Sequence, residues 1–297
     1  SDVRRFGGAR GSDSRAARTA MNFLAADALL PDGWASDVAI DVDDAGTIVA
    51  IASGASRGGR ELLDGPVVPA MPNVHSHAFQ RALAGRTGHV APGNDDSFWT
   101  WRKAMYGFLD RVDADAFEAI AAQAYVEMAK AGYATVAEFH YVHHDPAGKP
   151  YADPAELAWR IVAAARTAGL GLTLLPVFYA HGGFGGLPAT AGQRRFVHTI
   201  YTFAQLYDRL REGAAEGAYV LGVAPHSLRA VMPDELGQLV RMTAPTAPIH
   251  IHAAEQTREV DDCFAWSRLR PVEWLVTQAH VDARWCLVHA THMTERE

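Results

Sequence analysis

The sequence predicts an α/β protein built on a parallel sheet, and three observations support this. From Val67 onward, short apolar runs alternate with stretches of helical periodicity, which is the signature of repeated βα units. The apolar runs are nearly continuous rather than alternating, as in parallel strands that are buried on both faces. Several of the runs end in histidine. In barrels built from βα units, the active site forms at the carboxyl ends of the strands.

The first 66 residues differ from this pattern. Residues 1–20 are rich in Arg, Gly and Ser and have no apolar centre, so we interpret them as a flexible leader rather than a signal peptide. In residues 21–66, the alternating run Val38–Val42, a turn at 43–46 and the returning run Thr47–Ile51 predict short antiparallel strands. We therefore expect a small β-domain over 21–66 and an α/β domain over 67–297.

The α/β domain is expected to contain six strands separated by helices. The apolar runs that we interpret as strands are Val67–Val74, Ala134–His140, Gly171–Phe178, Tyr219–Ala224, Pro248–His252 and Trp285–His289. Helical periodicity covers Asp115–Ala131, Pro154–Ala168, Phe203–Ala214 and Pro233–Met242. A closed (β/α)₈ barrel needs eight strands, so strands seven and eight would be absent from this sequence. An open, doubly wound sheet of six strands is the alternative.

Composition narrows the function classes. The 297 residues are 49% hydrophobic and 21% charged, with a formal net charge of −7, the balance of a soluble globular enzyme. No apolar run reaches the roughly 20 residues that a membrane span needs. The acidic balance, with no basic stretch, argues against nucleic acid as a partner. Two cysteines, Cys263 and Cys286, are too few for a disulfide framework, so a cytoplasmic location is expected.

Four histidines at strand ends carry the strongest chemical signal. His75 and His77 lie two residues apart at the end of the first strand, so their side chains face the same side. His252 ends the fifth strand and His289 ends the sixth. Each histidine alone could equally be structural. Together they predict one metal ion bound by His75, His77 and His252, with His289 beside a metal-bound water.

Two further residues of the fifth strand and its loop belong to this argument. Glu255 follows His252 by about one turn, so its carboxylate can contact a metal-bound water without being a ligand. His250 shares the side-chain direction of His252 but lies deeper in the strand. We therefore assign His250 to the core or to a supporting hydrogen bond.

This arrangement resembles the amidohydrolase superfamily, in which HxH on strand one, His on strands five and six and Asp on strand eight surround the metal. The resemblance implies a (β/α)₈ TIM-type amidohydrolase barrel, with strands one to six present in this chain, and part of a small N-terminal β-sandwich domain. The sequence departs from the pattern because it does not contain the strand-eight Asp. Asp261 and Asp262 follow the fifth strand and cannot replace it.

The three lysines bear on the number of metal ions. Binuclear members of the superfamily bridge two metals with a carboxylated lysine at the end of strand four. Here Lys103 and Lys130 lie in helical stretches and Lys149 in a turn, while strand four ends in Val223–His226. The resemblance therefore implies a mononuclear site of the deaminase branch, in which an HxxE motif supplies a proton-shuttling Glu.

Longer strings resemble one family, the formimidoylglutamate deiminases of histidine degradation. The strings are HSHAFQRA at 75–82, SFWTWR at 97–102, AEFHY at 137–141, PHSLR at 225–229 and HAAEQT at 252–257. The resemblance implies zinc-dependent hydrolysis of N-formimidoyl-L-glutamate to N-formyl-L-glutamate and ammonia.

The resemblance also implies a set of substrate-binding residues. Arg102, Tyr141 and Arg229 match positions that bind the substrate carboxylates, a role that suits the planar fork of Arg. Gln80 and His226 match residues that hold the other polar groups of the substrate. The neighbouring histidines at 140, 143 and 144 match no ligand position, and we expect them to be loop residues.

The implied catalytic roles divide between metal ligands and proton carriers. Zinc, one per chain, on His75, His77 and His252 would activate a water, although iron or another divalent metal would also suit such a site. His289 and the strand-eight Asp of the family pattern would orient and deprotonate the water, and Glu255 would carry a proton to the departing nitrogen.

Alternatives remain at this point. Another amidohydrolase deaminase, acting on guanine- or cytosine-like rings, would share the metal site but would leave Arg102 and Arg229 unexplained. A non-catalytic metal-binding barrel would explain the missing Asp. The implied partner is a small dicarboxylate, with no nucleic acid and no membrane, and a homodimer is left open.

Overall fold

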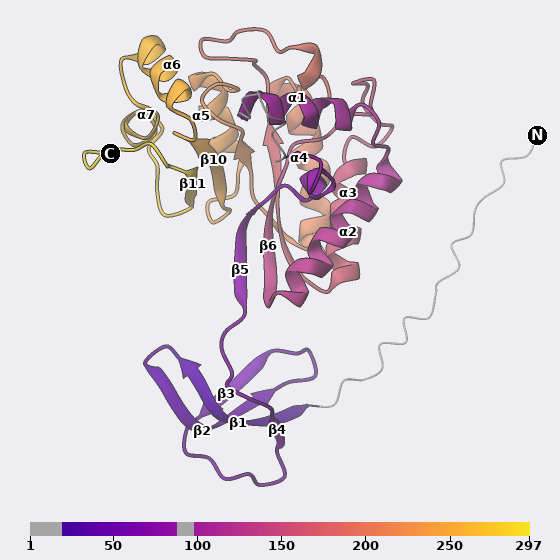
Figure 1. Ribbon diagram of the computed structural model, residues 1–297, viewed down its shortest axis with the longest axis vertical. Helices are drawn as coiled ribbons and strands as arrows, with labels where there is room; N and C mark the ends of the chain where they lie inside the picture. The colour runs from indigo at the N-terminus through magenta and orange to yellow at the C-terminus, as the bar shows by residue number, and fades with distance from the viewer. Residues whose placement is uncertain (1–19, 88–97) are drawn as a thin grey trace, which may run out of the picture. The chain divides into compact units, whose positions relative to one another are not determined.

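The computed structural model describes residues 20–87 and 98–297 and divides into two units, Ser1–Ala70 and Met71–Glu297 (Figure 1). Apart from Ala20, the leader expected over residues 1–20 lies outside the described residues. Within the described ranges, no helix is long and apolar enough to cross a membrane.

The first unit is a four-stranded sheet. Its strands are β1 (Met21–Leu30), β2 (Gly33–Val42), β3 (Ile48–Ala52) and β4 (Glu61–Leu63), in the order β3-β2-β1-β4. β1 and β2 pair antiparallel as a hairpin, and β4 lies parallel to β1. Ala25, Ala28, Val38 and Ile40 of β1 and β2 form a small buried hydrophobic cluster in this sheet. The β-domain expected from the sequence is confirmed in these strands, which form one sheet.

The second unit contains a parallel sheet that follows chain order. Its strands are β5 (Met71–Ser76), β6 (Tyr133–His140), β7 (Gly171–Phe178), β8 (Val220–Leu221), β9 (Ala224–Pro225), β10 (Ile249–Ala253) and β11 (Trp285–His289). β8 and β9 both pair with β7, and bridges from Val223 to Ile249 and from Ser227 to His252 carry the sheet on to β10 and β11.

The six expected strands are therefore present, and the fourth is split into two short pieces. The split falls at Gly222, whose N–H donates to the carbonyl of Leu174 at 2.9 Å. A Cβ on Gly222 would lie 2.5 Å from the carbonyl oxygen of Pro248, so only glycine permits this close approach. Every pair among β5 to β11 is parallel, and the carboxyl ends of these strands share one edge.

Helices lie beside the sheet (Figure 1). They are α1 (Phe98–Leu109), α2 (Ala114–Lys130), α3 (Glu156–Ala168), α4 (Ile200–Ala215), α5 (Pro233–Met242), α6 (Thr257–Ser267) and α7 (Pro271–Gln278), with short 3₁₀ turns η1 (Ala78–Leu83) and η2 (Ala191–Gln193). The four helices expected from periodicity are confirmed as α2 to α5. Asp113 accepts a hydrogen bond from the N–H of Ala116 to cap α2, and Gly169 ends α3 at φ 74°.

Candidate metal and substrate site

One cavity of about 310 Å³ opens at the carboxyl ends of the parallel strands, a size within the usual range of small-molecule sites. All ten residues singled out from the sequence line it: His75, His77, Gln80, Arg102, Tyr141, His226, Arg229, His252, Glu255 and His289. They come from six different segments of the chain, which the parallel topology brings to one edge of the sheet.

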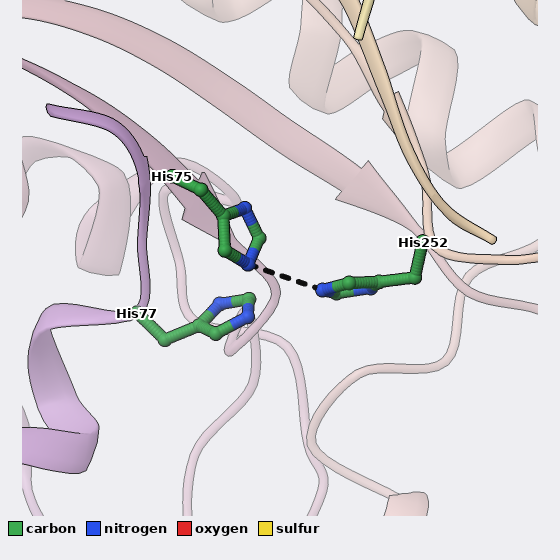
Figure 2. Close-up of side chains that lie close together, drawn as sticks. All are labelled: His75, His77 and His252. Carbon is green, nitrogen blue, oxygen red and sulfur yellow. Dashed lines mark hydrogen bonds between the residues drawn. The ribbon is translucent and has the colours of Figure 1, made fainter. Parts of the chain in front are cut away.

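Three of these histidines form a compact donor cluster. His75 belongs to β5, His77 directly follows it, and His252 lies in β10. One ring nitrogen from each lies within 4.8 Å of the other two. The Nε2 atoms of His75 and His252 are 3.2 Å apart (Figure 2). Two nitrogens at roughly 2.0–2.1 Å from a tetrahedral zinc would be separated by about 3.3 Å, so the spacing fits a shared metal ion.

The hydrogen bonds of two imidazoles leave their inward nitrogens free for a metal. Nδ1 of His77 lies 3.0 Å from the carbonyl oxygen of Phe139, and Nδ1 of His252 lies 3.1 Å from that of His226. A carbonyl only accepts hydrogen bonds, so each Nδ1 carries the proton and each Nε2 has its lone pair available. This donor set fits a resident metal ion.

The protonation state of the cluster suits the same role. Burial, with repulsion from neighbouring histidines, lowers the pKa of His75 to about 3, and burial lowers that of His77 to about 4. Burial also holds the pKa of His252 well below its usual range. At neutral pH all three rings are uncharged, and only neutral imidazole binds a metal.

The ends of β10 and β11 adopt an unusual backbone conformation beside the cluster. Ala254, His289 and Ala290 have φ values of 52°, 72° and 48°, a left-handed region that is costly for residues other than glycine. Hydrogen bonds from Ala290 N to Ala253 O (2.9 Å) and from His292 N to Ala254 O (3.0 Å) join the two strand ends. Such strain persists only where the surroundings enforce it, and here it sets the positions of Glu255 and His289.

A second carboxylate, that of Glu259, binds the backbone at Glu255, and it was not predicted from the sequence. Glu259, only 4% exposed, accepts hydrogen bonds from the N–H groups of Ala254 and Glu255, both at 3.2 Å. The Oε1 atom of Glu255 lies 4.0 Å from Nε2 of His289. Glu259 therefore sets the backbone of the loop that presents Glu255. Its only sequence signal is an acidic residue in the first turn of α6, a common position for surface carboxylates.

A similar buried carboxylate supports the His77 side of the site. Glu138 is 1% exposed and accepts a hydrogen bond from the N–H of Ala78 at 2.8 Å. Burial raises the pKa of Glu138 to about 7. The residue lies within a string used for the resemblance, but nothing in its spacing pointed to a contact 60 residues away.

Two guanidinium groups, those of Arg102 and Arg229, also line the cavity. Arg102 Nε donates to the hydroxyl of Tyr106 at 2.7 Å, and Gln80 Nε2 donates to the hydroxyl of Tyr141 at 2.9 Å. Nε of Arg229 is buried and has no hydrogen-bond partner among the described residues. A buried, unpartnered guanidinium nitrogen at a cavity wall fits an anionic ligand.

His226 lies next to Arg229 and is kept neutral. Burial, reinforced by the positive charge of Arg229, holds the pKa of His226 well below its usual range. Its Nδ1 atom lies 3.1 Å from the hydroxyl of Ser227, so the ring presents a neutral polar edge to the cavity.

Five lining residues were not identified from the sequence. They are Trp101, Met105, Tyr106, Tyr179 and Phe196, and three of them belong to α1, the helical stretch that contains Lys103. Their only signal was the aromatic character of the segment around Trp101, which also suits ordinary packing.

The structure also places the histidines outside the metal cluster. His250 is 7% exposed within β10, as expected for a core residue. The expectation that His140, His143 and His144 are loop residues was wrong for His140, which ends β6, and all three are buried. The sequence did not show that His198 packs against this group, with ring centroids 4.8 Å from His143 and 4.7 Å from His144.

We expect this histidine group to make the protein acid-labile. Burial lowers the pKa of His198 to about 3, whereas in the unfolded chain the ring binds a proton below its ordinary pKa of about 6.5. The unfolded state thus binds more protons between these values, and the free energy of unfolding falls as pH drops below 6.5. His198→Gln should reduce the loss of stability between about pH 7.5 and pH 5.5 by about 1.4 kcal/mol.

Urea unfolding at the two pH values measures this difference. His280→Gln serves as control, because it makes the same substitution at an exposed position. An unchanged pH dependence in a folded His198→Gln protein would contradict the prediction.

A parallel βα sheet with a histidine cluster at its strand ends is typical of metal-binding hydrolases of the barrel class. The family model of the amidohydrolase family matches residues 67–297, and the chain belongs to this family. Residues 21–64 match the model described as the N-terminal domain of formimidoylglutamate deiminase HutF.

Individual relatives agree with this assignment. The chain is 52% identical over 270 residues to formimidoylglutamate deiminase of Pseudomonas aeruginosa, covering 91% of this chain and 59% of that protein. It is 25% identical to a 5-methylthioadenosine/S-adenosylhomocysteine deaminase of Halalkalibacterium halodurans, covering 85% of this chain and 53% of the relative. The chain thus spans between half and two thirds of each relative's length.

A solved structure shares the fold closely. The crystal structure of an amidohydrolase from Brucella melitensis superposes with a TM-score of 0.88 at 50% sequence identity, covering 93% of this chain and 61% of that chain. The expected α/β class and barrel-type architecture are confirmed by this likeness and by the family match.

Proposed function

We propose that the protein hydrolyses N-formimidoyl-L-glutamate to N-formyl-L-glutamate and ammonia, using one zinc ion. The observation that carries the proposal is a single cavity lined both by three neutral imidazoles and by two arginines, Arg102 and Arg229. A ligand that has both a hydrolysable polar group and carboxylates complements this lining. The 52% identity to a formimidoylglutamate deiminase supports the same choice.

The metal ligands proposed are His75, His77 and His252. A divalent ion held by these rings would lower the pKa of a bound water and so supply a nucleophile at neutral pH. Three neutral nitrogens and room for further oxygen donors suit zinc, and the same set also binds iron.

The arginines bind and orient the substrate. Arg229 presents its buried Nε to one carboxylate, and Arg102 presents the guanidinium that Tyr106 orients. Tyr141 adds its hydroxyl, which already accepts from Gln80. These contacts hold a group that does not change during the reaction, so their task is to place the formimidoyl carbon beside the imidazole cluster.

Proton transfer is assigned to His289 and Glu255, which line the cavity beside the histidine cluster. His289 Nε2 and Glu255 Oε1 are 4.0 Å apart. His289 accepts a hydrogen bond from the attacking water and orients it. Glu255 takes one proton from the water as its oxygen adds to the formimidoyl carbon and delivers it to the imino nitrogen. It then transfers the remaining proton of the new hydroxyl group to the same nitrogen, so that the C–N bond breaks, ammonia leaves and the formyl C=O bond forms.

Ammonia release from N-formimidoyl-L-glutamate by the complete, zinc-loaded protein tests the function. We expect steady turnover of this substrate and none of guanine, cytosine or 5-methylthioadenosine. Turnover of a nucleobase with none of the dicarboxylate would instead support the nucleobase deaminase alternative, for which the two arginines have no role.

Metal analysis tests the cofactor separately. The purified complete protein should contain about one equivalent of zinc with nitrogen-rich coordination, at metal–nitrogen distances of roughly 2.0–2.1 Å. His252→Ala removes one of three imidazoles and should leave the protein nearly metal-free after dialysis. His250→Ala is a matched control, since it truncates a buried histidine in the same strand outside the donor cluster. Two bound metals, or full zinc content in His252→Ala, would refute the proposed ligand set.

A further inference from the structure

The segment Thr190–Phe196, here called the α1 seat, packs against the helix that carries Arg102. It includes η2 and continues to Phe196, which lines the cavity. None of its residues took part in the sequence analysis. Three contacts carry the argument, two at the carboxyl end of α1 and one at Tyr106 in its second half.

A fully buried arginine makes the first contact at the helix end. Arg195 is 1% exposed, and its Nη1 donates to the carbonyl oxygens of Leu109 (2.5 Å) and Val112 (2.9 Å). Its Nε donates to the carbonyl oxygen of His144 at 2.8 Å. The last carbonyls of a helix have no partner within the helix and carry partial negative charge. Arg195 therefore satisfies the end of α1 and joins it to the loop after β6.

The adjacent arginine repeats this connection nearer the surface. Arg194 forms an ion pair with Asp110 at 2.6 Å and donates from Nε to the carbonyl oxygen of Pro146 at 3.0 Å. Gly148, in the same loop, leaves room for this side chain, because a Cβ there would lie 2.9 Å from Cβ of Arg194. Two consecutive arginines thus tie the same two segments together.

The third contact lies directly beneath a residue that orients Arg102. A Cβ on Gly192 would lie 2.5 Å from Cδ2 and 3.0 Å from Cε2 of Tyr106, so the ring rests against the bare backbone of the seat. The hydroxyl of Tyr106 accepts the hydrogen bond from Nε of Arg102. Any side chain at Gly192 must displace this ring and with it the partner of Arg102.

We infer that the α1 seat sets the position of Arg102, with Gly192 and Arg195 as positioning residues that never touch the substrate. Gly192 acts through Tyr106, and Arg195 acts through the carboxyl end of α1. This role rests on the proposed function, in which Arg102 binds a substrate carboxylate. Neither residue is expected to influence the imidazole cluster or Glu255, so they should affect substrate binding more than the chemical step.

Gly192→Ala tests the inference with the smallest added volume. We expect KM to rise about tenfold with kcat changed less than about twofold, because the contact to the carboxylate is equally present in ground and transition states. Amide hydrogen exchange in α1, measured without substrate, should become about tenfold faster, since the helix loses its fixed support. Zinc content should not change.

Gly213→Ala is the matched control. It also forces a Cβ into contact, at 2.8 Å from the hydroxyl of Tyr219 and 3.0 Å from the ring of Trp159, but none of these residues lines the cavity. It should alter stability without changing KM or exchange in α1. Equal effects of the two substitutions on KM would overturn the inference, as would normal α1 exchange in a folded Gly192→Ala protein.

Arg195→Lys provides a second test that keeps the charge but loses the fork that reaches several carbonyls. It should also raise KM and speed α1 exchange, and unchanged values for both would count against the role of Arg195. The exchange measurement needs no substrate. If the unmodified protein releases no ammonia from formimidoylglutamate, the proposed function is wrong, while the exchange results still decide whether the seat fixes α1.

Discussion

Glu255→Gln is expected to lower kcat by about 10²–10⁴-fold, the usual contribution of a positioned general acid–base group. Glutamine keeps the shape of the side chain and some of its hydrogen bonding, but it cannot take up and release a proton. The backbone that presents the side chain should stay in place, because Glu259 still accepts from the N–H groups of residues 254 and 255. Zinc content should stay near one equivalent, since Glu255 is outside the three-imidazole cluster.

Steady-state kinetics and metal analysis of the same preparation measure this result. Glu295→Gln, on the exposed surface, makes the same chemical change away from the cavity and should leave both quantities unaltered. If Glu255→Gln retained nearly normal kcat, or lost its zinc, the proton-transfer role would have to be abandoned.

Arg229→Met should raise KM strongly while kcat stays within a few-fold. Methionine retains much of the apolar stem but removes the guanidinium that faces the cavity with a buried, unpartnered Nε. Loss of one partner from a buried, hydrogen-bonded charge pair costs about 2–5 kcal/mol, so KM should increase by roughly 30- to 5,000-fold. A substrate carboxylate is unchanged in the reaction, and uniform binding of this kind appears in KM rather than kcat.

Arg241→Met is the appropriate comparison, because Arg241 is an exposed arginine in the last turn of α5. It should not change KM. Two analogues, each lacking one of the two carboxylates, should both bind the unmodified protein weakly, and one of them should lose little more when Arg229 is replaced. An equal loss for the substrate and for both analogues would mean that Arg229 does not contact a carboxylate.

The histidine cluster could be predicted because its signal is local. Side chains two residues apart in a strand face the same side, so HxH at 75–77 already placed two imidazoles together. The parallel arrangement of βα units then placed His252 and His289 at the same edge. The structure adds the tautomers, which depend on the carbonyls of Phe139 and His226.

The supporting carboxylates could not be predicted in the same way. Glu138 and Glu259 are ordinary acidic residues in the sequence, and their importance comes from burial against N–H groups next to His77 and Glu255. Burial depends on how the surrounding elements pack. A sequence pattern without that packing gives both residues the far commoner interpretation of a solvated surface charge.

By itself, the sequence determined the elements with strong periodicity, six parallel strands and four helices, and the histidines at the strand ends. Together with the resemblance, it identified ten of the fifteen residues that line the cavity. Only the tertiary structure decided how α1 is held and which residues stand behind the site. The physical reason is separation along the chain. Arg195 reaches the carbonyl of Leu109 across 86 residues, and Tyr106 rests on Gly192. Neither contact produces a periodic pattern in the sequence, because each depends on how folding brings two remote segments together.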